Sequence, residues 1–566
     1  MLTLLVLHFC VFYQLDAIGL TGPDEPRYAA IAREMAESGD WVTPRLHGKP
    51  WFEKPALYYW DAALRYEIWG DTEFSARSPS AAAAAATALA LGWLALQIYG
   101  WQAAAAVMLL FPTTVAVIGF GRAATTDMLF AASLAMAMTA AARIVLLGNS
   151  HAASAQSADH GAEQLPRLWI ERLWRCGFGA ALGLAALAKG PAALVLAGGS
   201  VGLWMVATRR WKDGVRLLHP LALLSFFVVA LPWYVLCAMR NPEFVDVFLI
   251  SHNLQRYLTP VFRHEQPFWF FGPLLLLGLV PWTPLLAAAF SDAVAMLRKR
   301  AWKYSASFFI ACWVIFPVLF FSLSKSKLPG YVLPVIPALA LLLARSLSKR
   351  VEARQHSARW LQFAVSAALL LLAAGALLPS TSAQLPGVAA NALRLLALIG
   401  GTGAMVVAVF ALRKQPWRGA AAAAITVAAL AAAITTTVLP SMDANISART
   451  TARRLIAIQA RQGGNLTVHK LHRAWHHGLN YYLKRDLPVW TPGSATDLAV
   501  TTEAGLADLE AQGKVAQVLD RISRQAIIVR LREQAPAGEN GGPSRRDAPL
   551  RVNKPSHSTA SLSEPE

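Results

Sequence analysis

Long apolar runs separated by short polar segments make up most of the chain. A helical run of about 17–23 residues is long enough to cross the roughly 30 Å hydrocarbon core of a bilayer. Thirteen such runs occur, near residues 3–20, 79–97, 101–120, 126–147, 174–188, 191–207, 217–238, 270–290, 306–323, 331–347, 360–379, 391–411 and 418–438. The two runs around Lys189 are short, and Pro191 interrupts them. The pattern predicts a mainly α, polytopic membrane protein with about thirteen transmembrane helices.

The basic residues between these runs indicate an orientation. Every second loop is strongly basic, with Arg209, Arg210, Lys212 and Arg216; Arg298, Lys299, Arg300 and Lys303; Lys349, Arg350, Arg354 and Arg359; and Arg413, Lys414 and Arg418. Short loops rich in Lys and Arg remain on the cytoplasmic side. The N-terminus is therefore predicted to be cytoplasmic, which places three polar segments on the opposite, extracytoplasmic face: 21–78, 240–269 and the chain after 440.

The composition supports a membrane protein. Only 15% of the 566 residues are charged and 55% are hydrophobic, whereas soluble chains are about 25% charged. A net charge of +19 would suggest nucleic acid if the basic residues shared one polar face, but they are spread over many loops. The four cysteines show no C-x-x-C spacing, which argues against a disulfide framework. Residues 1–20 lack a basic start and a cleavage site, so we expect a first transmembrane helix there.

The polar segments suggest three regions. Residues 1–440 are predicted to form the transmembrane part, including a long first loop (21–78) with a helical pattern from Pro26 to Glu37 and a second loop (240–269). Residues 441–532 contain β-like stretches at 465–468 and 526–531, which predict a small extracytoplasmic α/β domain. The composition of 533–566 and of 148–166 predicts a disordered tail and a flexible cytoplasmic insertion.

Two adjacent acids, Asp24 and Glu25, begin the helical pattern of the first loop. They are compatible with helix capping, with Asp24 as the N-cap and Pro26 in the first turn. However, the same loop also contains the pair Glu53 and Lys54 among aromatic residues. A plain linker needs only solubility, so this combination favours a functional site.

Cations occur on the face where basic residues should be scarce. They are Lys54, Lys189, Lys325 and Lys327. A lone Lys or Arg near a membrane commonly extends to the interface without further function. Several cations together on the extracytoplasmic face instead suggest an anionic ligand, most simply a lipid phosphate. The aromatic residues nearby, such as those of 58–60 and 268–271, are typical of an interfacial belt, although some can line a groove for a sugar or an isoprenoid chain.

Several motifs resemble a known family. They are Asp24-Glu25-Pro26-Arg27-Tyr28-Ala29, Ser38-Gly39-Asp40-Trp41-Val42-Thr43-Pro44, Phe52-Glu53-Lys54-Pro55-Ala56-Leu57-Tyr58-Tyr59-Trp60, Thr126-Asp127-Met128 and Lys327-Leu328-Pro329-x-Tyr331-x-Leu333-Pro334. Together they resemble the lipid-carrier-dependent glycosyltransferases with the GT-C fold. The closest resemblance is to the 4-amino-4-deoxy-L-arabinose transferases of lipid A, which are related to protein O-mannosyltransferases.

The resemblance implies a reaction and a set of residues. A sugar would leave undecaprenyl phosphate on the periplasmic face of a bacterial inner membrane and join a lipid A phosphate with inversion. The implied catalytic acids are Asp24 and its neighbour Glu25, with Asp24 acting as a base or positioning the acceptor. The implied substrate-binding residues are Arg27, Tyr28, Lys54, Tyr58, Asp127, Lys189, Arg256, Lys325, Lys327 and Tyr331. Members of the family can also bind a divalent metal, here zinc, through Glu53 with His264 or, as second choice, His252; two ligands are too few for a closed structural site.

Other interpretations remain open at this point. The same machinery can transfer a sugar to a protein hydroxyl or to a glycan. A transporter for a polyprenyl-linked substrate is a different class, but such proteins usually show inverted repeats and polar groups near the midplane, and we detect neither. The histidines at 469, 472, 476 and 477 are interpreted as a solvated face, with metal binding as the alternative.

Overall fold

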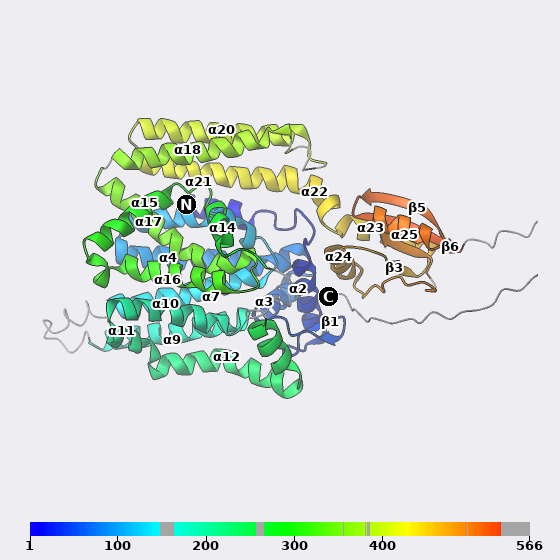
Figure 1. The fold of residues 1–566 in the computed structure, drawn as a ribbon, viewed down its shortest axis with the longest axis horizontal. Coiled ribbons are helices and arrows are strands. Elements are labelled where there is room, and N and C mark those ends of the chain that lie inside the picture. The colour runs from blue at the N-terminus through cyan, green and yellow to red at the C-terminus, as the bar shows by residue number, and fades with distance from the viewer. Residues whose placement is uncertain are drawn as a thin grey trace, which may run out of the picture.

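The computed structural model describes residues 1–533 except 148–163, 256–264, 355, 380, 382–384, 386 and 495. Most of the described chain is helical and forms one bundle (Figure 1). Within the described residues, eight helical segments are long and apolar enough to cross a membrane: Glu73–Tyr99, Thr126–Leu147, Pro220–Arg240, Ala306–Leu323, Pro329–Glu352, His356–Ala376, Ala390–Leu412 and Pro416–Ile446. A ninth is counted if the bent pair Trp101–Thr113 and Val115–Gly121 is one span. The mainly α, polytopic fold is confirmed, whereas the count of thirteen spans stays a prediction.

Each of the thirteen apolar runs contains at least one helix, but three runs are broken. The run 101–120 bends by 60° between Thr113 and Val115. The other two are 3–20 and 270–290. The first holds only α1 (Leu2–Leu7) and η1 (His8–Phe12), and the chain turns to an extended conformation at Tyr13. The run 270–290 is divided between α14 (Phe271–Gly278) and α15 (Leu285–Arg298). Pro281 and Pro284 lie between them, and proline cannot continue the hydrogen-bond pattern of a helix interior. Continuous spanning helices in these two runs were therefore a wrong expectation.

The remaining helices pack beside these spans. Figure 1 shows α18 (His356–Ala376), α20 (Ala390–Leu412) and α21 (Pro416–Ala433) along one side of the bundle, and α9 (Gln164–Lys189) and α12 (Pro220–Arg240) along the other. Between these two sides lie α4 (Glu73–Tyr99), α7 (Thr126–Ala142), α10 (Ala192–Thr208), α16 (Ala306–Leu323) and α17 (Ile336–Glu352) (Figure 1). Helices α5 (Trp101–Leu110) and α6 (Val115–Gly121) pack against α4. Many of the buried side chains are alanines, which let helix backbones approach closely.

The first loop lies at one end of the bundle (Figure 1). It contains α2 (Asp24–Ser38), the short strands β1 (Arg45–Leu46) and β2 (Lys49–Pro50), and α3 (Leu57–Trp69). Gly39 ends α2 in the left-handed conformation (φ 68°), which glycine adopts without steric cost. Trp233 Nε1 of α12 donates to Val42 O (2.9 Å), and Asn241 Nδ2 donates to Thr43 Oγ1 (3.0 Å). These bonds fix the loop against the bundle.

The C-terminal segment lies at the same end (Figure 1). It follows α22 (Leu439–Ile446) and has a four-stranded sheet in the order β3-β4-β6-β5, with β3 and β4 parallel and the other pairs antiparallel. Its elements are α23 (Arg449–Gln462), β3 (Leu466–Val468), α24 (Arg473–Leu483), β4 (Leu498–Thr501), α25 (Glu503–Ala511), β5 (Lys514–Ser523) and β6 (Ala526–Glu533). The two predicted β-like stretches became β3 and β6. Helix α24 packs against α2 of the first loop.

Candidate active site

The start of α2 presents the Asp24 carboxylate. Asp24 is the first residue of the helix, and the N-cap, Pro23, makes no side-chain cap. The carboxylate instead accepts a hydrogen bond from Arg27 Nη2, one turn further along. The Asp24 side chain is 48% exposed and that of Arg27 only 5%. The capping interpretation of Asp24 is therefore wrong, and this acid remains accessible beside a buried cation.

Glu25 lies in a different environment from Asp24. Its two carboxylate oxygens accept bonds from Arg77 Nε (3.0 Å) and Nη2 (2.8 Å) and from the backbone N–H groups of Ala124 and Thr21 (both 2.7 Å). Burial favours a raised pKa for Glu25, but Arg77 and these hydrogen bonds outweigh it and lower the pKa. The carboxylate is buried, ionised and fully bonded. We therefore reassign Glu25 from a catalytic acid to a residue that positions the start of α2.

Arg27 links Asp24 to the pair Glu53 and Lys54. Arg27 Nη1 lies 3.1 Å from Glu53 Oε2, and Glu53 Oε1 accepts a bond from Lys54 Nζ (3.1 Å). The Arg27 guanidinium also lies over the Trp51 ring, 5.4 Å from its centroid. Asp24, Arg27, Glu53 and Lys54 thus form one line of alternating charge, although Arg27 and Glu53 are 26 positions apart in the sequence.

A second ion pair joins the bundle to this line. Lys189, at the end of α9, donates to Asp127 at the start of α7. Lys54 lies near enough to interact electrostatically with Asp127. The ammonium group of Lys189 is 5.3 Å from the centroid of the Tyr331 ring. A Cβ on Gly330 would lie 2.6 Å from Asp127 Oδ1, so this close approach requires glycine.

The two lysines before Tyr331 differ in their exposure to solvent. Lys327 is 7% exposed, and its Nζ donates to Ser324 O (2.7 Å) and to Gln266 O (2.9 Å). Lys325 is exposed. Lys327 therefore holds its loop in place from within the protein, whereas Lys325 lies at the surface.

The tyrosines of the loop form a buried cluster. Tyr58 is fully buried and donates its hydroxyl to Ala76 O (2.9 Å), so a substrate-binding role does not fit its position. Tyr28 is 3% exposed and packs against the rings of Tyr58 and Tyr59, with centroids 6.1 and 6.0 Å away. The Tyr59 hydroxyl is buried and, within the described part of the chain, lacks a hydrogen-bond partner. Burial and the nearby charge of Glu53 raise its pKa. The sequence interpretation grouped Tyr59 with belt aromatics and missed this hydroxyl.

The predicted zinc ligands do not form a metal site among the described residues. No group of three His, Cys, Asp or Glu side chains comes together there. Both oxygens of Glu53 are paired with cations. His252 lies in η6 (Asp246–Gln255), while Arg256 and His264 lie outside the described residues. The described donors alone are too few for a zinc site, and we derive no step through a metal.

The C-terminal histidines fit the solvated face that the sequence suggested only at His472, which is exposed. His469 is 6% exposed and its Nε2 is 2.8 Å from Asp508 Oδ2. His476 Nε2 pairs with Leu487 O (3.0 Å). Burial, and secondly the positive charge of Arg27, lowers the pKa of His477 to about 3. His477 of α24 therefore lies close to Arg27 of the candidate site. The sequence around His477 gave no sign of this proximity.

The geometry defines a class of protein. Acidic and basic side chains from the first loop, α7 and α9 gather beside the Tyr331 ring at one end of a polytopic helical bundle. The sequence model of the dolichyl-phosphate-mannose-protein mannosyltransferase family matches residues 4–248. The crystal structure of ArnT from Cupriavidus metallidurans bound to undecaprenyl phosphate has a TM-score of 0.72 and 25% identity, covering 93% of this chain and 96% of that one. The chain has the GT-C fold.

The relatives found by sequence make the resemblance more specific. The chain is 37% identical over 332 residues to an undecaprenyl phosphate-alpha-4-amino-4-deoxy-L-arabinose arabinosyl transferase of Sodalis glossinidius, and 35% identical over 345 residues to one of Edwardsiella ictaluri. These alignments cover 57% and 60% of this chain, and only 55% and 58% of the relatives. The resemblance inferred from the loop motifs is confirmed: the chain has the GT-C fold and is similar to ArnT in structure and to arabinosyl transferases in sequence.

Proposed function

We propose that this protein is an inverting glycosyltransferase that moves 4-amino-4-deoxy-L-arabinose from undecaprenyl phosphate to a phosphate of lipid A. The observation that carries the proposal is the line of charges from the accessible Asp24 through Arg27, Glu53 and Lys54 to Asp127 and Lys189. The similar structure with bound undecaprenyl phosphate and the names of the sequence relatives support it. We further propose that the protein lies in a bacterial inner membrane with this site facing the periplasm.

The residues suggest how one displacement would proceed. An oxygen of the acceptor phosphate attacks the anomeric carbon of the sugar, and the bond from that carbon to the carrier phosphate breaks. The departing undecaprenyl phosphate keeps the bonding electrons and gains negative charge. Lys54 and Lys189 are placed to stabilise that charge, and preorganised cations lower the barrier most in a site shielded from water.

Asp24 has a different task for each acceptor. A phosphate acceptor is already an anion and needs little deprotonation, so Asp24 together with Arg27 would orient it. A hydroxyl acceptor needs a base, and the accessible carboxylate of Asp24 suits that role. The match of residues 4–248 to a mannosyltransferase family favours a protein hydroxyl as the second candidate acceptor.

Mass spectrometry of lipid A tests the proposal. Cells that produce the protein should carry an aminoarabinose mass increment on lipid A, and cells without it should not. Cells with Asp24→Asn should lack the increment while membrane levels of the protein stay the same. Unchanged lipid A together with altered glycoproteins would select the second candidate.

Zinc at Glu53, with His264 as a further ligand, stays a prediction. Metal analysis of the purified protein, compared with the Glu53→Gln and His264→Ala variants, tests it. Metal content that is unchanged in both variants would remove these residues as ligands.

A further inference from the structure

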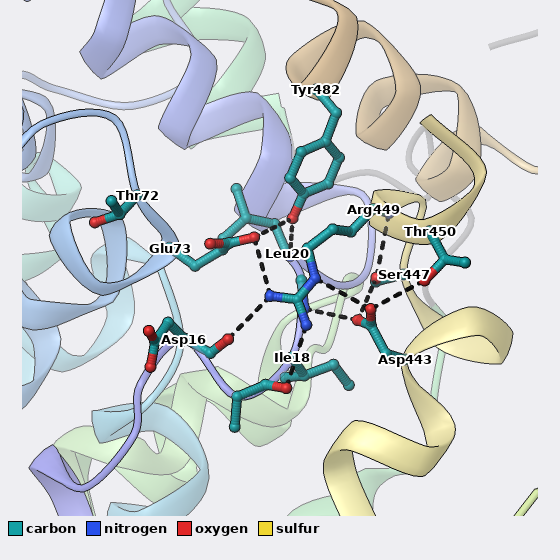
Figure 2. Close-up of polar contacts among 12 residues, drawn as sticks. Asp16, Ile18, Leu20, Thr72, Glu73, Asp443, Ser447, Arg449, Thr450 and Tyr482 are labelled. Atoms are coloured by element: carbon teal, nitrogen blue, oxygen red, sulfur yellow. Dashed lines mark hydrogen bonds and ion pairs between the residues drawn. The ribbon is translucent and has the colours of Figure 1, made fainter. Parts of the chain in front are cut away.

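An arginine of the C-terminal segment reaches the loop that leads into α2. Figure 2 shows the Arg449 side chain, from the first position of α23, among the backbone of residues 16–20. Its Nη1 donates to Asp16 O (2.9 Å) and lies 3.3 Å from Glu73 Oε1, while its Nη2 donates to Ala17 O (3.2 Å). The side chain is only 14% exposed. A buried guanidinium is stable only when its donors are paired, so these contacts define where the loop backbone lies.

Two further side chains, Asp443 of α22 and Tyr482 of α24, hold the same loop (Figure 2). Asp443 accepts from Gly19 N (2.8 Å) through Oδ1 and from Arg449 Nε (3.1 Å) through Oδ2. The Tyr482 hydroxyl accepts from Leu20 N (2.8 Å) and donates to Glu73 Oε1 (2.9 Å). We call Asp443, Arg449 and Tyr482 the clasp. The clasp provides hydrogen-bond partners for four backbone groups of residues 16–20, a stretch without helix or strand structure.

The approach of the clasp requires a glycine in the loop. A Cβ on Gly19 would lie 2.5 Å from Ser447 Oγ, 2.7 Å from the Tyr482 hydroxyl and 2.8 Å from the Arg449 Cβ. Such distances are too short for a side chain at this position. Thr21 forms an antiparallel bridge with Ser447 directly beyond it. The loop and the C-terminal part therefore fit each other closely.

The same loop is also bound to the residue beside Asp24. Arg77 of α4 donates to Leu15 O and Ile18 O (both 2.7 Å) and to Gly19 O (2.8 Å), and also binds the Glu25 carboxylate. Residues 15–19 are thus bound by both Arg77 and Arg449. Because Glu25 adjoins Asp24, the position of this short loop is coupled to that of the candidate catalytic carboxylate.

We propose that the clasp is a positioning device through which the C-terminal segment fixes Asp24 relative to Arg27 and Lys54. Arg449, Asp443 and Tyr482 are positioning residues that act through the loop 16–20 and do not touch substrate. The proposal rests on the proposed function for the role of Asp24. It gives the C-terminal segment a task in catalysis, because a misplacement of about 1 Å can cost about 100-fold in rate.

The first test does not depend on activity. Hydrogen exchange followed by mass spectrometry is measured on the full-length protein in lipid nanodiscs, for wild type, Arg449→Ala and Tyr482→Phe. Peptides covering residues 13–28 should exchange faster in both variants, with the larger change in Arg449→Ala. Arg454→Ala is the matched control, since Arg454 lies on the same helix, is 68% exposed and contacts Asp520 only at 3.9 Å. Exchange in 13–28 equal to that of wild type in both clasp variants overturns the proposal.

The second test separates positioning from simple stability. The transfer assay uses undecaprenyl-phosphate-linked aminoarabinose and lipid A, with kcat and the donor KM measured for each variant. We expect kcat to fall about 10- to 100-fold in Arg449→Ala, less in Tyr482→Phe, and not in Arg454→Ala, with the donor KM within about twofold of wild type in all three. A loss of kcat that only tracks the fraction of unfolded protein contradicts the proposal. If Arg449→Ala does not fold, Tyr482→Phe, which keeps the ring, decides by the same criteria.

The outcomes also distinguish the two proposals. If Asp24→Asn abolishes transfer and the clasp variants retain the kcat of wild type, the clasp proposal fails and the proposed function stands. If wild-type protein shows no transfer with this donor and acceptor while exchange in 13–28 rises in the clasp variants, the proposed function fails. In that case the clasp stands only as a coupling of the C-terminal segment to the loop.

Discussion

Two ion clusters at opposite ends of the bundle show how differently the same residue types can be used. One surrounds Asp292 of α15, which binds Arg350 Nη1 (2.6 Å), Lys349 Nζ (2.9 Å) and Ser346 Oγ (2.8 Å), all from the last two turns of α17. The other is the line from Asp24 to Lys189, which approaches Tyr331 just before α17 begins. The 17 residues of that helix separate the clusters by about 25 Å, at 1.5 Å per residue.

The difference lies in how the charges are arranged. Arg350 also donates to Ala288 O (3.1 Å) and Ser291 Oγ (2.7 Å), so the Asp292 cluster joins two helices through many bonds between close neighbours. The cluster at the other end is drawn from four separate stretches of the chain and includes an acid that is half exposed. We propose that the Asp292 cluster serves stability and that the Asp24 cluster meets a charged ligand. Each prediction below changes one end and leaves the other intact.

Replacement of Asp24 should have the largest effect on activity. Asp24→Asn removes the negative charge beside Arg27 and keeps the side-chain shape, so transfer should fall by about 10² to 10⁴-fold, the usual contribution of such a group. The thermal midpoint should change little, because the side chain is half exposed. The transfer rate and the melting curve are measured on purified protein. Activity near that of wild type would remove Asp24 from the catalytic list.

Replacement of Lys189 should mainly weaken use of the donor. Lys189→Ala removes one cation from the predicted phosphate side and leaves Asp127 without its ion pair. We expect kcat/KM for the donor to fall about 10- to 100-fold, as for the loss of a charge-assisted hydrogen bond. Steady-state kinetics check this, with Lys299→Ala, an exposed lysine beside the other cluster, as the matched control. Equal kinetics in both variants would favour simple interface anchoring of Lys189.

Replacement of Asp292 should affect stability and not chemistry. Asp292→Asn removes the charge that pairs Arg350 and Lys349, so the free energy of unfolding should fall by about 1–3 kcal/mol, the cost of leaving buried partners poorly satisfied. The thermal midpoint should fall by a few degrees, while kcat at 25 °C stays the same. A large loss of kcat without a change in the midpoint would show that the two ends are not functionally distinct.

The smallest predicted effect is a pH dependence at His477, close to Arg27. Its pKa is about 3 in the folded protein, because of burial and then the positive charge of Arg27, against about 6.5 in an unfolded chain. Between these values only the unfolded chain takes up the proton, so stability is highest above about pH 6.5 and falls as the pH drops toward 3. In His477→Gln the thermal midpoint should fall less between pH 7.5 and pH 5 than in wild type. The exposed His356→Gln serves as control, and an identical pH response in wild type and His477→Gln would contradict the assignment.

Much of the fold was predictable because membrane insertion constrains sequence strongly. Apolar runs such as 79–97 and 391–411 became single helices, since a bilayer requires about 20 apolar residues and internally satisfied backbone groups. The runs 3–20 and 270–290 were misread because hydropathy alone does not show where a helix stops. Their breaks depend on prolines and on tertiary contacts such as the bonds from Arg77 to the loop 15–19.

The candidate site was only partly predictable. Motifs identified Asp24, Arg27, Lys54, Asp127 and Tyr331, and the unexpected cations on the extracytoplasmic face identified Lys189. The structure brings these six residues to one end of the bundle. The sequence could not show that Asp24 is accessible and Glu25 is buried. The two residues are adjacent, but a helix points neighbouring side chains in different directions. The same limit applied to Tyr58 and Tyr59. The clasp was not predictable, since Arg449 meets Asp16 across 433 positions of sequence.

Binding of undecaprenyl phosphate alone tests the central claim most directly, because it requires neither the sugar nor the acceptor. The carrier is titrated against wild type, Lys54→Ala and Asp24→Asn in nanodiscs, and the three dissociation constants are compared. We predict binding that weakens about 10- to 100-fold in Lys54→Ala and stays within about threefold of wild type in Asp24→Asn. Equal affinity of wild type and Lys54→Ala would show that this cation does not receive the carrier phosphate, and would contradict the account.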